Sequence, residues 1–316
     1  MAHARSVAES AECVALGMEC LRLLLGVKGL LHAKHWHVAR ALGAAASAAR
    51  AVEAVSSGLC QWGGQNRREV TTSSAAAPSA ASMPERTAES MGVTKAHSAL
   101  VEAQAAAWAT ATEAVAWAME RAVTCVSRLL RTHGKLVYAA ASLLAQLHSA
   151  CFHAVAQLVE DAFVLTSRPS SVSSVYSATP PANARICLSL LKRLGGRSAR
   201  ALARLLADTS ADAHQLSLKK HLPPLLLDAM AGLELPGWAS LASSAEGGGG
   251  GDATSSSSFG KRDLQPGILA CLAALGPREV QLVSSLLPGG RDGAPRALFK
   301  QLLEDYTKRH KYRGQH

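Results

Sequence analysis

Apolar residues recur every three or four positions through most of the chain, and this spacing marks one face of an α-helix. The stretches with this spacing are 6–60, with a break near 26–29, then 95–132, 135–166 and 183–232. We expect two helices in the first stretch and two or three in the last, which is interrupted at Gly195–Gly196 and near residues 208–212. Ala and Leu, the strongest helix formers, dominate the composition. The pattern therefore predicts an all-α fold.

Three stretches rich in Ser, Gly and Pro interrupt the helices, namely 63–94, 168–181 and 243–260. Such segments cannot bury enough apolar surface to offset the entropy of ordering, so we predict disordered loops. The chain then divides into an Ala-rich helical segment at 1–62, a linker at 63–94 and a helical C-terminal domain at 95–316, with flexible inserts at 168–181 and 243–260. Successive antiparallel helices of this length favour an irregular, HEAT-like α-solenoid.

The last fifty residues carry the most specific pattern. Pro266–Gly267 suits the first turn of a helix, because proline there gives up a donor that would be unpaired anyway. A second short helix opens at Pro277. In the final helix one apolar stripe comprises Leu298, Phe299, Leu302, Leu303 and Tyr306. We expect this stripe to dock on the other helices, with Phe299 buried.

Charge and cysteine usage narrow the function classes. The net charge of +10 favours acidic partners, with nucleic acid or acidic protein surfaces ahead of membranes. Seven scattered cysteines without a Cys-x-x-Cys pair argue against a disulfide framework and for a reducing compartment. No apolar run reaches the roughly 20 residues that span a bilayer. We therefore expect an intracellular protein with no membrane contact.

Motifs that support catalysis are missing from the sequence. No Gly-x-Ser-x-Gly, Walker-type or His-Glu-x-x-His motif occurs. His32 and His35 have a spacing that places two imidazoles on one metal, but no third ligand is close in sequence and Lys34 would repel a cation. We expect no enzyme activity, no cofactor and no bound metal.

Two basic clusters are the candidate binding residues. Arg193, Arg197, Arg200 and Arg204 have helical spacing, and the last three stay aligned even if the glycines interrupt the helix. Such a stripe can neutralise phosphates along RNA, or can be a solvated face. The tail combines Lys308, Arg309, Lys311 and Arg313 with Tyr312, whose ring can stack on unpaired bases. A solvated end and a nuclear-import signal remain alternatives for the tail.

The ending resembles the C-terminal domain of a known family, that of unhealthy ribosome biogenesis protein 2, also called nucleolar pre-ribosomal-associated protein 2. The resemblance rests on the Pro-Gly-Ile step at 266–268, on Leu298-Phe-Lys-x-Leu-x-x-x-Tyr306 and on the basic, aromatic finish at 308–314. Weaker similarity at 129–137, 201–206 and 218–227 extends it to about residues 95–316. Family members are far longer, so we expect a fragment, a truncated gene model or a divergent short form.

The resemblance implies a non-enzymatic nucleolar scaffold in ribosome biogenesis, with a role in large-subunit pre-rRNA processing and early pre-ribosome assembly. It also implies three partners: pre-ribosomal RNA or the pre-ribosomal particle, another large nucleolar scaffold and a DEAD-box RNA helicase. The implied location is the nucleus and nucleolus. The alternative is another helical-repeat adaptor, such as a nuclear transport receptor fragment, which the basic charge of this chain disfavours.

Overall fold

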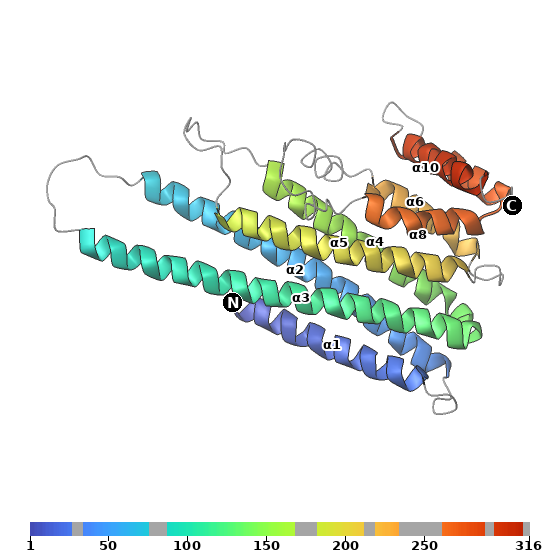
Figure 1. The fold of residues 1–316 in the computed structure, drawn as a ribbon, viewed down its shortest axis with the longest axis horizontal. Coiled ribbons are helices and arrows are strands. Elements are labelled where there is room, and N and C mark those ends of the chain that lie inside the picture. Colours follow the sequence, from blue (N-terminus) through green and yellow to red (C-terminus); the bar gives the residue numbers. More distant parts are fainter. Residues whose placement is uncertain are drawn as a thin grey trace.

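The computed structural model describes residues 1–26, 34–75, 87–167, 182–211, 219–233, 261–287 and 294–311. In these ranges the backbone forms nine α-helices, one short 3-10 helix and no strand (Figure 1). The elements are α1 (Ala2–Gly26), α2 (His35–Ala75), α3 (Thr87–Ala139), α4 (Ala141–Ser167), α5 (Ala182–Ala211), η2 (Lys219–His221), α6 (Leu222–Leu233), α8 (Lys261–Ala274), α9 (Pro277–Leu286) and α10 (Ala294–Lys311). The all-α prediction is confirmed for the described residues.

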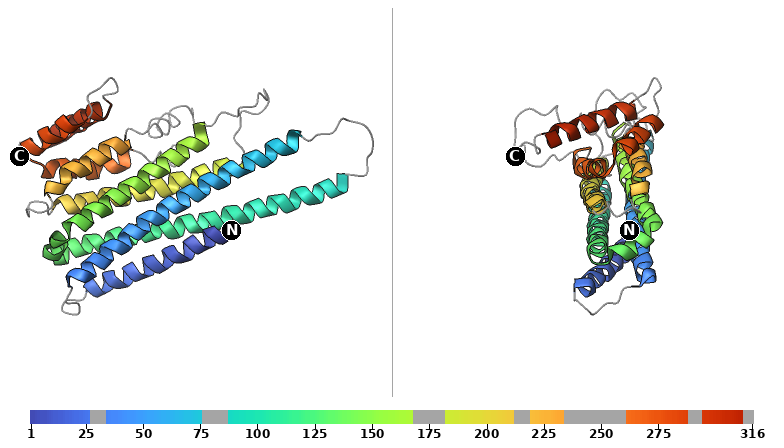
Figure 2. Two further views of the ribbon diagram at one scale, coloured as in Figure 1. Left: turned by 180° about the vertical axis from the view of Figure 1, so that it is seen from behind. Right: turned by 90° about the vertical axis from the view of Figure 1, so that its right-hand side faces the viewer.

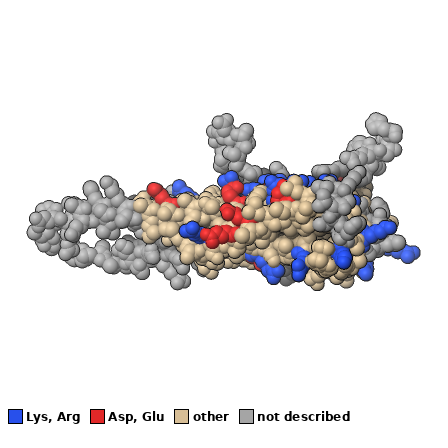
Figure 3. All heavy atoms as spheres, turned by 90° about the horizontal axis from the view of Figure 1, so that it is seen from below, with Lys and Arg blue, Asp and Glu red and all other residues tan. Residues whose placement is uncertain are grey.

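The helices form two layers, which the right-hand view of Figure 2 shows end-on. One layer contains α1, α3, α5 and α8, each packed against the next, and the other contains α2, α4, α6 and α9 in the same way. Contacts of α2 with α3 and α5, and of α4 with α5, join the layers. α10 crosses one end of the array and packs on α6 and α8. α1 lies at the opposite edge, the edge that faces the viewer in Figure 3.

Small side chains allow the helices of a layer to approach closely. The buried face of α1, which packs mainly on α3, consists of Ala4, Ala8, Ala11 and Ala15 together with Met18 and Leu25. Alanine ends at Cβ, so the helix axes can come near each other without leaving voids.

One buried carboxylate links the helices of the other layer. Ser56 Oγ of α2 donates a hydrogen bond of 2.6 Å to Asp161 Oδ2 of α4, and Gln157 Nε2 donates one of 3.1 Å to Oδ1. Both oxygens of this mostly buried group are therefore paired, as buried polar groups require.

The predicted linker at 63–94 does not separate two packing units. Helix α2 continues to Ala75 and α3 begins at Thr87. Helices α1 and α2, from the predicted N-terminal segment, pack on α3, α4 and α5 of the predicted C-terminal domain. The predicted inserts at 168–181 and 243–260, and residues 76–86 of the predicted linker, lie outside the described residues.

Three predicted helix boundaries need correction. Helix α5 continues through Gly195–Gly196, because both glycines are buried and its packing against four helices outweighs the roughly 0.5–1 kcal/mol that each glycine costs. The predicted break at His133–Gly134 is confirmed as a kink at His133 (φ −133°, ψ 35°), but α3 continues beyond it to Ala139, so the next helix begins at Ala141 and not at residue 135. Helix α8 begins at Lys261, before Pro266, and this earlier start buries Leu264.

The predicted docking of the final helix is confirmed. Phe299 is only 2% exposed, and Leu298 and Leu302 are also buried where α10 meets α6 and α8. The predicted break near 26–29 also agrees with the end of α1 at Gly26.

Within the described ranges, no single helix has both the length and the apolar content to cross a bilayer. The consecutive helical segments Ser98–Ala139 and Ala141–Thr166 meet these criteria only as a pair. The second segment is bent by 114° relative to the first.

Candidate nucleic-acid interface

The predicted arginine stripe lies on a single helix, α5. Because α5 is continuous, it carries all four residues of the stripe: Arg193, Arg197, Arg200 and Arg204. The fold brings a carboxylate within 4 Å of each of them. These carboxylates come from α3, α5 and α8, so most of them are far from the arginines in sequence.

Arg197 is the most constrained member of the stripe. Its Nε and Nη2 donate to Glu120 at 2.7 and 2.8 Å, and its Nη1 donates to Glu113 at 2.7 Å. The hydrogen bonds with Glu120 and its charge, followed by the charge of Glu113, raise the pKa of Arg197 above its ordinary value. The side chain is 21% exposed. Arg197 therefore ties α5 to α3, and its charge is already neutralised.

Arg200 and Arg204 are more accessible, with side chains 56% exposed. Arg200 Nη1 lies 3.4 Å from Asp263 of α8, and Arg204 Nε lies 3.9 Å from Asp208, beyond hydrogen-bond length. Arg131 of α3 holds Asp208 more closely, at 2.9 Å. Exposed pairs of this kind contribute about 0–1 kcal/mol, so both guanidinium groups can exchange a carboxylate for a phosphate.

The predicted basic tail begins as helix. Lys308 is exposed near the end of α10, which continues through Arg309 to Lys311. The side chains of Arg309 and Lys311 are not described, and Tyr312 and Arg313 lie outside the described residues. Cations in the last turn of a helix are stabilised by its dipole, which gives Lys308 a structural role as well.

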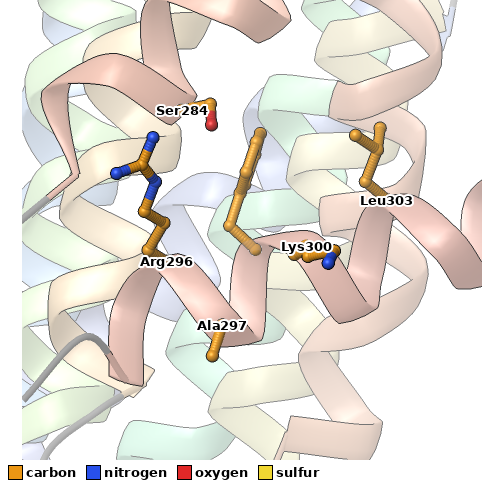
Figure 4. A pocket seen from close by; sticks show the side chains of 6 residues that line it. Ser284, Arg296, Ala297, Lys300 and Leu303 are labelled. Atoms are coloured by element: carbon orange, nitrogen blue, oxygen red, sulfur yellow. The ribbon is translucent and has the colours of Figure 1, made fainter. Parts of the chain in front are cut away.

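A second basic surface on α10 was missed in the sequence. Arg296 and Lys300 border a shallow cavity of about 390 Å³ between α9 and α10 (Figure 4). Arg296 of α10 extends toward Ser284 of α9 on one side of this cavity, and Leu303 of α10 lies on the other side. Among the described residues, neither Arg296 nor Lys300 has an ion-pair partner. The sequence signal for this surface was the i, i+4 spacing of Arg296 and Lys300, with Lys308 two helical turns further along the same helix.

The histidine-rich segment starts a helix. His32 lies outside the described residues, and His35 is exposed. The ring of His37 stacks on Trp36 with centroids 3.6 Å apart, and its Nδ1 accepts a hydrogen bond of 3.0 Å from the backbone N–H of Lys34. In the described ranges, no group of three or more His, Cys, Asp or Glu side chains is placed to hold a metal ion.

Buried titratable groups occupy packing positions. His148 links α4 to α5, with Nδ1 2.7 Å from the Leu144 carbonyl and Nε2 3.2 Å from Thr209 Oγ1. Burial lowers the pKa of His148 to about 4. Burial also raises thiol pKa values, to about 11 for Cys125 and to about 12 for Cys151, Cys187 and Cys271. Such thiols stay protonated and unreactive at neutral pH.

Comparison with known proteins gives one match. Residues 252–315, which include α8, α9 and α10, match the family model described as the Urb2/Npa2 family. No curated protein and no solved structure matches the chain. The match covers the helices that carry Gly267, Phe299 and Lys308, where the resemblance in the sequence was strongest. It implies a role in ribosome biogenesis, and through this C-terminal segment it supports membership of the chain in the Urb2/Npa2 family.

Proposed function

We propose that the protein is a non-enzymatic scaffold of ribosome biogenesis, located in the nucleus and nucleolus, that supports large-subunit pre-rRNA processing and early pre-ribosome assembly. The observation that carries this proposal is the family match at residues 252–315. The buried, neutral state of His148 and of four thiols also favours a scaffold over an enzyme. Another large nucleolar scaffold and a DEAD-box RNA helicase are the partners that the resemblance implies.

The two-layer arrangement supports a short, irregular α-solenoid as the architecture of this scaffold. Each successive helix pair contributes one helix to each of the two layers; the pairs are α1–α2, α3–α4, α5–α6 and α8–α9. Proteins built in this way have an extended surface for their size, which suits a component that holds several partners together.

The proposed contact with pre-ribosomal RNA uses the accessible cations of α5 and α10. Arg200 and Arg204 have replaceable carboxylate partners, whereas Arg197 would have to break three short hydrogen bonds. The remaining residues of the proposed contact are those of the tail: Lys308, Arg309, Lys311, Tyr312 and Arg313. Each phosphate contact releases counterions, so the affinity should fall steeply with salt.

Two charge-removal variants test this contact. The first is Arg200→Gln with Arg204→Gln, and the second replaces the four tail cations by Gln. Glutamine is preferable to glutamate on α5, because Asp263 and Asp208 are mostly buried and would repel a new carboxylate. Binding to structured ribosomal RNA across a salt series should weaken, and the slope of log affinity against log salt should decrease by about 1 per lost phosphate contact.

A matched control for the α5 variant is Arg50→Gln with Arg128→Gln, which also removes two charges, from exposed positions on α2 and α3. This control should keep the wild-type salt slope. Co-sedimentation with pre-ribosomal particles is measured in parallel. If the tail variant no longer co-sediments with pre-ribosomal particles while its RNA affinity and salt slope are unchanged, the tail binds protein and the proposed RNA contact is wrong. If no variant changes either measurement, both basic clusters are solvated surface.

A further inference from the structure

Helix α1 is apolar on two opposite faces over its second half. The inward face packs on α3 and α2. On the outward face, every exposed residue between positions 13 and 24 is apolar or glycine: Cys13, Leu16, Gly17, Cys20, Leu23 and Leu24. The leucines at 16, 23 and 24 are 57%, 55% and 42% exposed. A helix that is apolar on both sides is normally buried on both sides.

The outward residues have the spacing of a helix-packing seam. Cys13 and Cys20 are seven residues apart, and so are Leu16 and Leu23, with the two pairs offset by three. This is the a and d pattern by which one helix packs along another. The flanking charges do not cover the seam, because Glu19 is held by Arg22 at 2.6 Å and by Arg121 of α3 at 3.0 Å. The seam therefore fits a helix as its occupant.

The position of α1 in the array explains the missing neighbour. Among the helices that the structure describes in this layer, α3 and α5 each have a helix on both sides, whereas α1 has one only on the side of α3. The end of such an array normally carries a polar outer face that keeps it in solution. The outer face of α1 is polar only in its first turns, where Arg5 and Glu9 pair at 3.0 Å. The second half of α1 lacks this polar cap.

Within the described ranges, the carboxylates beside the seam are paired with arginines, with the exception of Glu12. A groove of about 480 Å³ runs next to the seam and is lined by Glu12, Leu16, Glu113, Ala114, Trp117 and Arg197. Glu113 is paired with Arg193 and Arg197, while Glu12 is exposed and has no ion-pair partner among the described residues. Figure 3 shows acidic and basic side chains next to one another in the middle of this edge, beside a surface that carries no charge. A segment bound at the seam would therefore be favoured by a positively charged side chain that pairs with Glu12.

We propose that the outward face of α1, residues 13–24, binds a basic amphipathic helix of a partner protein. The apolar stripe of that helix packs on Leu16, Cys20 and Leu23, and a lysine or arginine at its edge pairs with Glu12. This surface is built on α1, whereas the proposed RNA contact uses cations of α5 and α10, and the two come nearest at the groove that Arg197 lines.

The test uses the full chain and a synthetic peptide as the probe. The peptide has roughly three heptads with Leu at a and d and Lys at e and g. A matched peptide has Glu in place of every Lys. The Lys peptide should bind, and the Glu peptide should bind at least about tenfold more weakly. Bound Lys peptide should also slow the alkylation of Cys13 and Cys20, which lie within the seam.

Substitutions in the protein separate the contributions of apolar contact and of charge to peptide binding. Leu16→Gln with Leu23→Gln should weaken binding of the Lys peptide by about tenfold or more. The fold should keep its stability, because both side chains are exposed. Leu282→Gln with Leu286→Gln, an exposed pair on α9, is the control and should bind normally. Glu12→Lys should reverse the preference toward the Glu peptide.

Four results would overturn the proposal. One is the absence of binding by either peptide, and a second is equal binding of both. A third is equal loss in the α9 control, which would indicate non-specific adhesion. The last is a dimer seen by sedimentation that Leu16→Gln with Leu23→Gln dissociates, because the occupant would then be a second copy of this chain.

Discussion

Gly267 is the position where one methyl group has the largest expected effect on how the C-terminal helices are attached. It lies in α8, where that helix crosses α5. A Cβ at this position would lie 2.6 Å from the carbonyl oxygen of Ala203, 2.7 Å from its Cα and 3.0 Å from its carbonyl carbon. All three atoms belong to the backbone, so no rotamer change relieves the contact. Gly267→Ala therefore has to push α8 away from α5.

The size of the effect follows from that displacement. To reach an ordinary contact of 3.4 Å, the helices must separate locally by about 0.8 Å, and a gap of that size forfeits a quarter to a half of each dispersion contact. The neighbouring residues that α8 buries are Leu264, Ile268, Cys271 and Leu272. Overpacking of this kind costs about 1–3 kcal/mol, and the gain of about 0.5–1 kcal/mol from replacing a helical glycine offsets part of it. We expect Gly267→Ala to lower the free energy of unfolding by about 1–2 kcal/mol.

The assay is urea denaturation followed by far-ultraviolet circular dichroism, with amide hydrogen exchange in α8 as a local readout. The matched control is Gly43→Ala in α2, because a Cβ there meets nothing within 4 Å. The control should raise stability by about 0.5–1 kcal/mol, since it brings only the gain in helix propensity. If Gly267→Ala is as stabilising as Gly43→Ala, or leaves exchange in α8 unchanged, the close crossing of α5 and α8 is wrong.

Two further predictions concern the core. Phe299→Ala should lower the free energy of unfolding by about 3–5 kcal/mol, because it leaves a cavity under α10, and an equilibrium denaturation curve that matches wild type would contradict the burial of the ring. His148 stays neutral in the folded protein down to about pH 4, whereas its unfolded value is 6.5, so the unfolded chain binds the additional proton between these values. Stability should therefore fall as pH drops from 6.5 to 4, by up to about 3 kcal/mol, and the fall should be smaller in His148→Gln. The same pH dependence in both proteins would mean that His148 is not the group responsible.

Local sequence was sufficient for the helices and for their buried faces. The stripe at Leu298, Phe299 and Leu302 predicted which side of the last helix is buried, because residues three and four apart share a face in any α-helix. The break after Gly26 was also visible, since glycine and the loss of apolar spacing are local signals. The family resemblance of the ending depended on the same short-range pattern, and the match at 252–315 agrees with it.

The tertiary structure decided the features that depend on neighbours distant in sequence. Gly195–Gly196 stays helical because four other helices pack on α5, and glycine's small propensity cost cannot compete with that burial. Arg197 was one of the candidate binding residues in the sequence, and the fold pairs it with Glu113 and Glu120, which lie 84 and 77 residues away. In the sequence, the apolar spacing of the exposed seam of α1 likewise could not be distinguished from that of a buried helix face. Periodicity shows which side of a helix is apolar, but only the packing of the whole chain determines whether that side is covered.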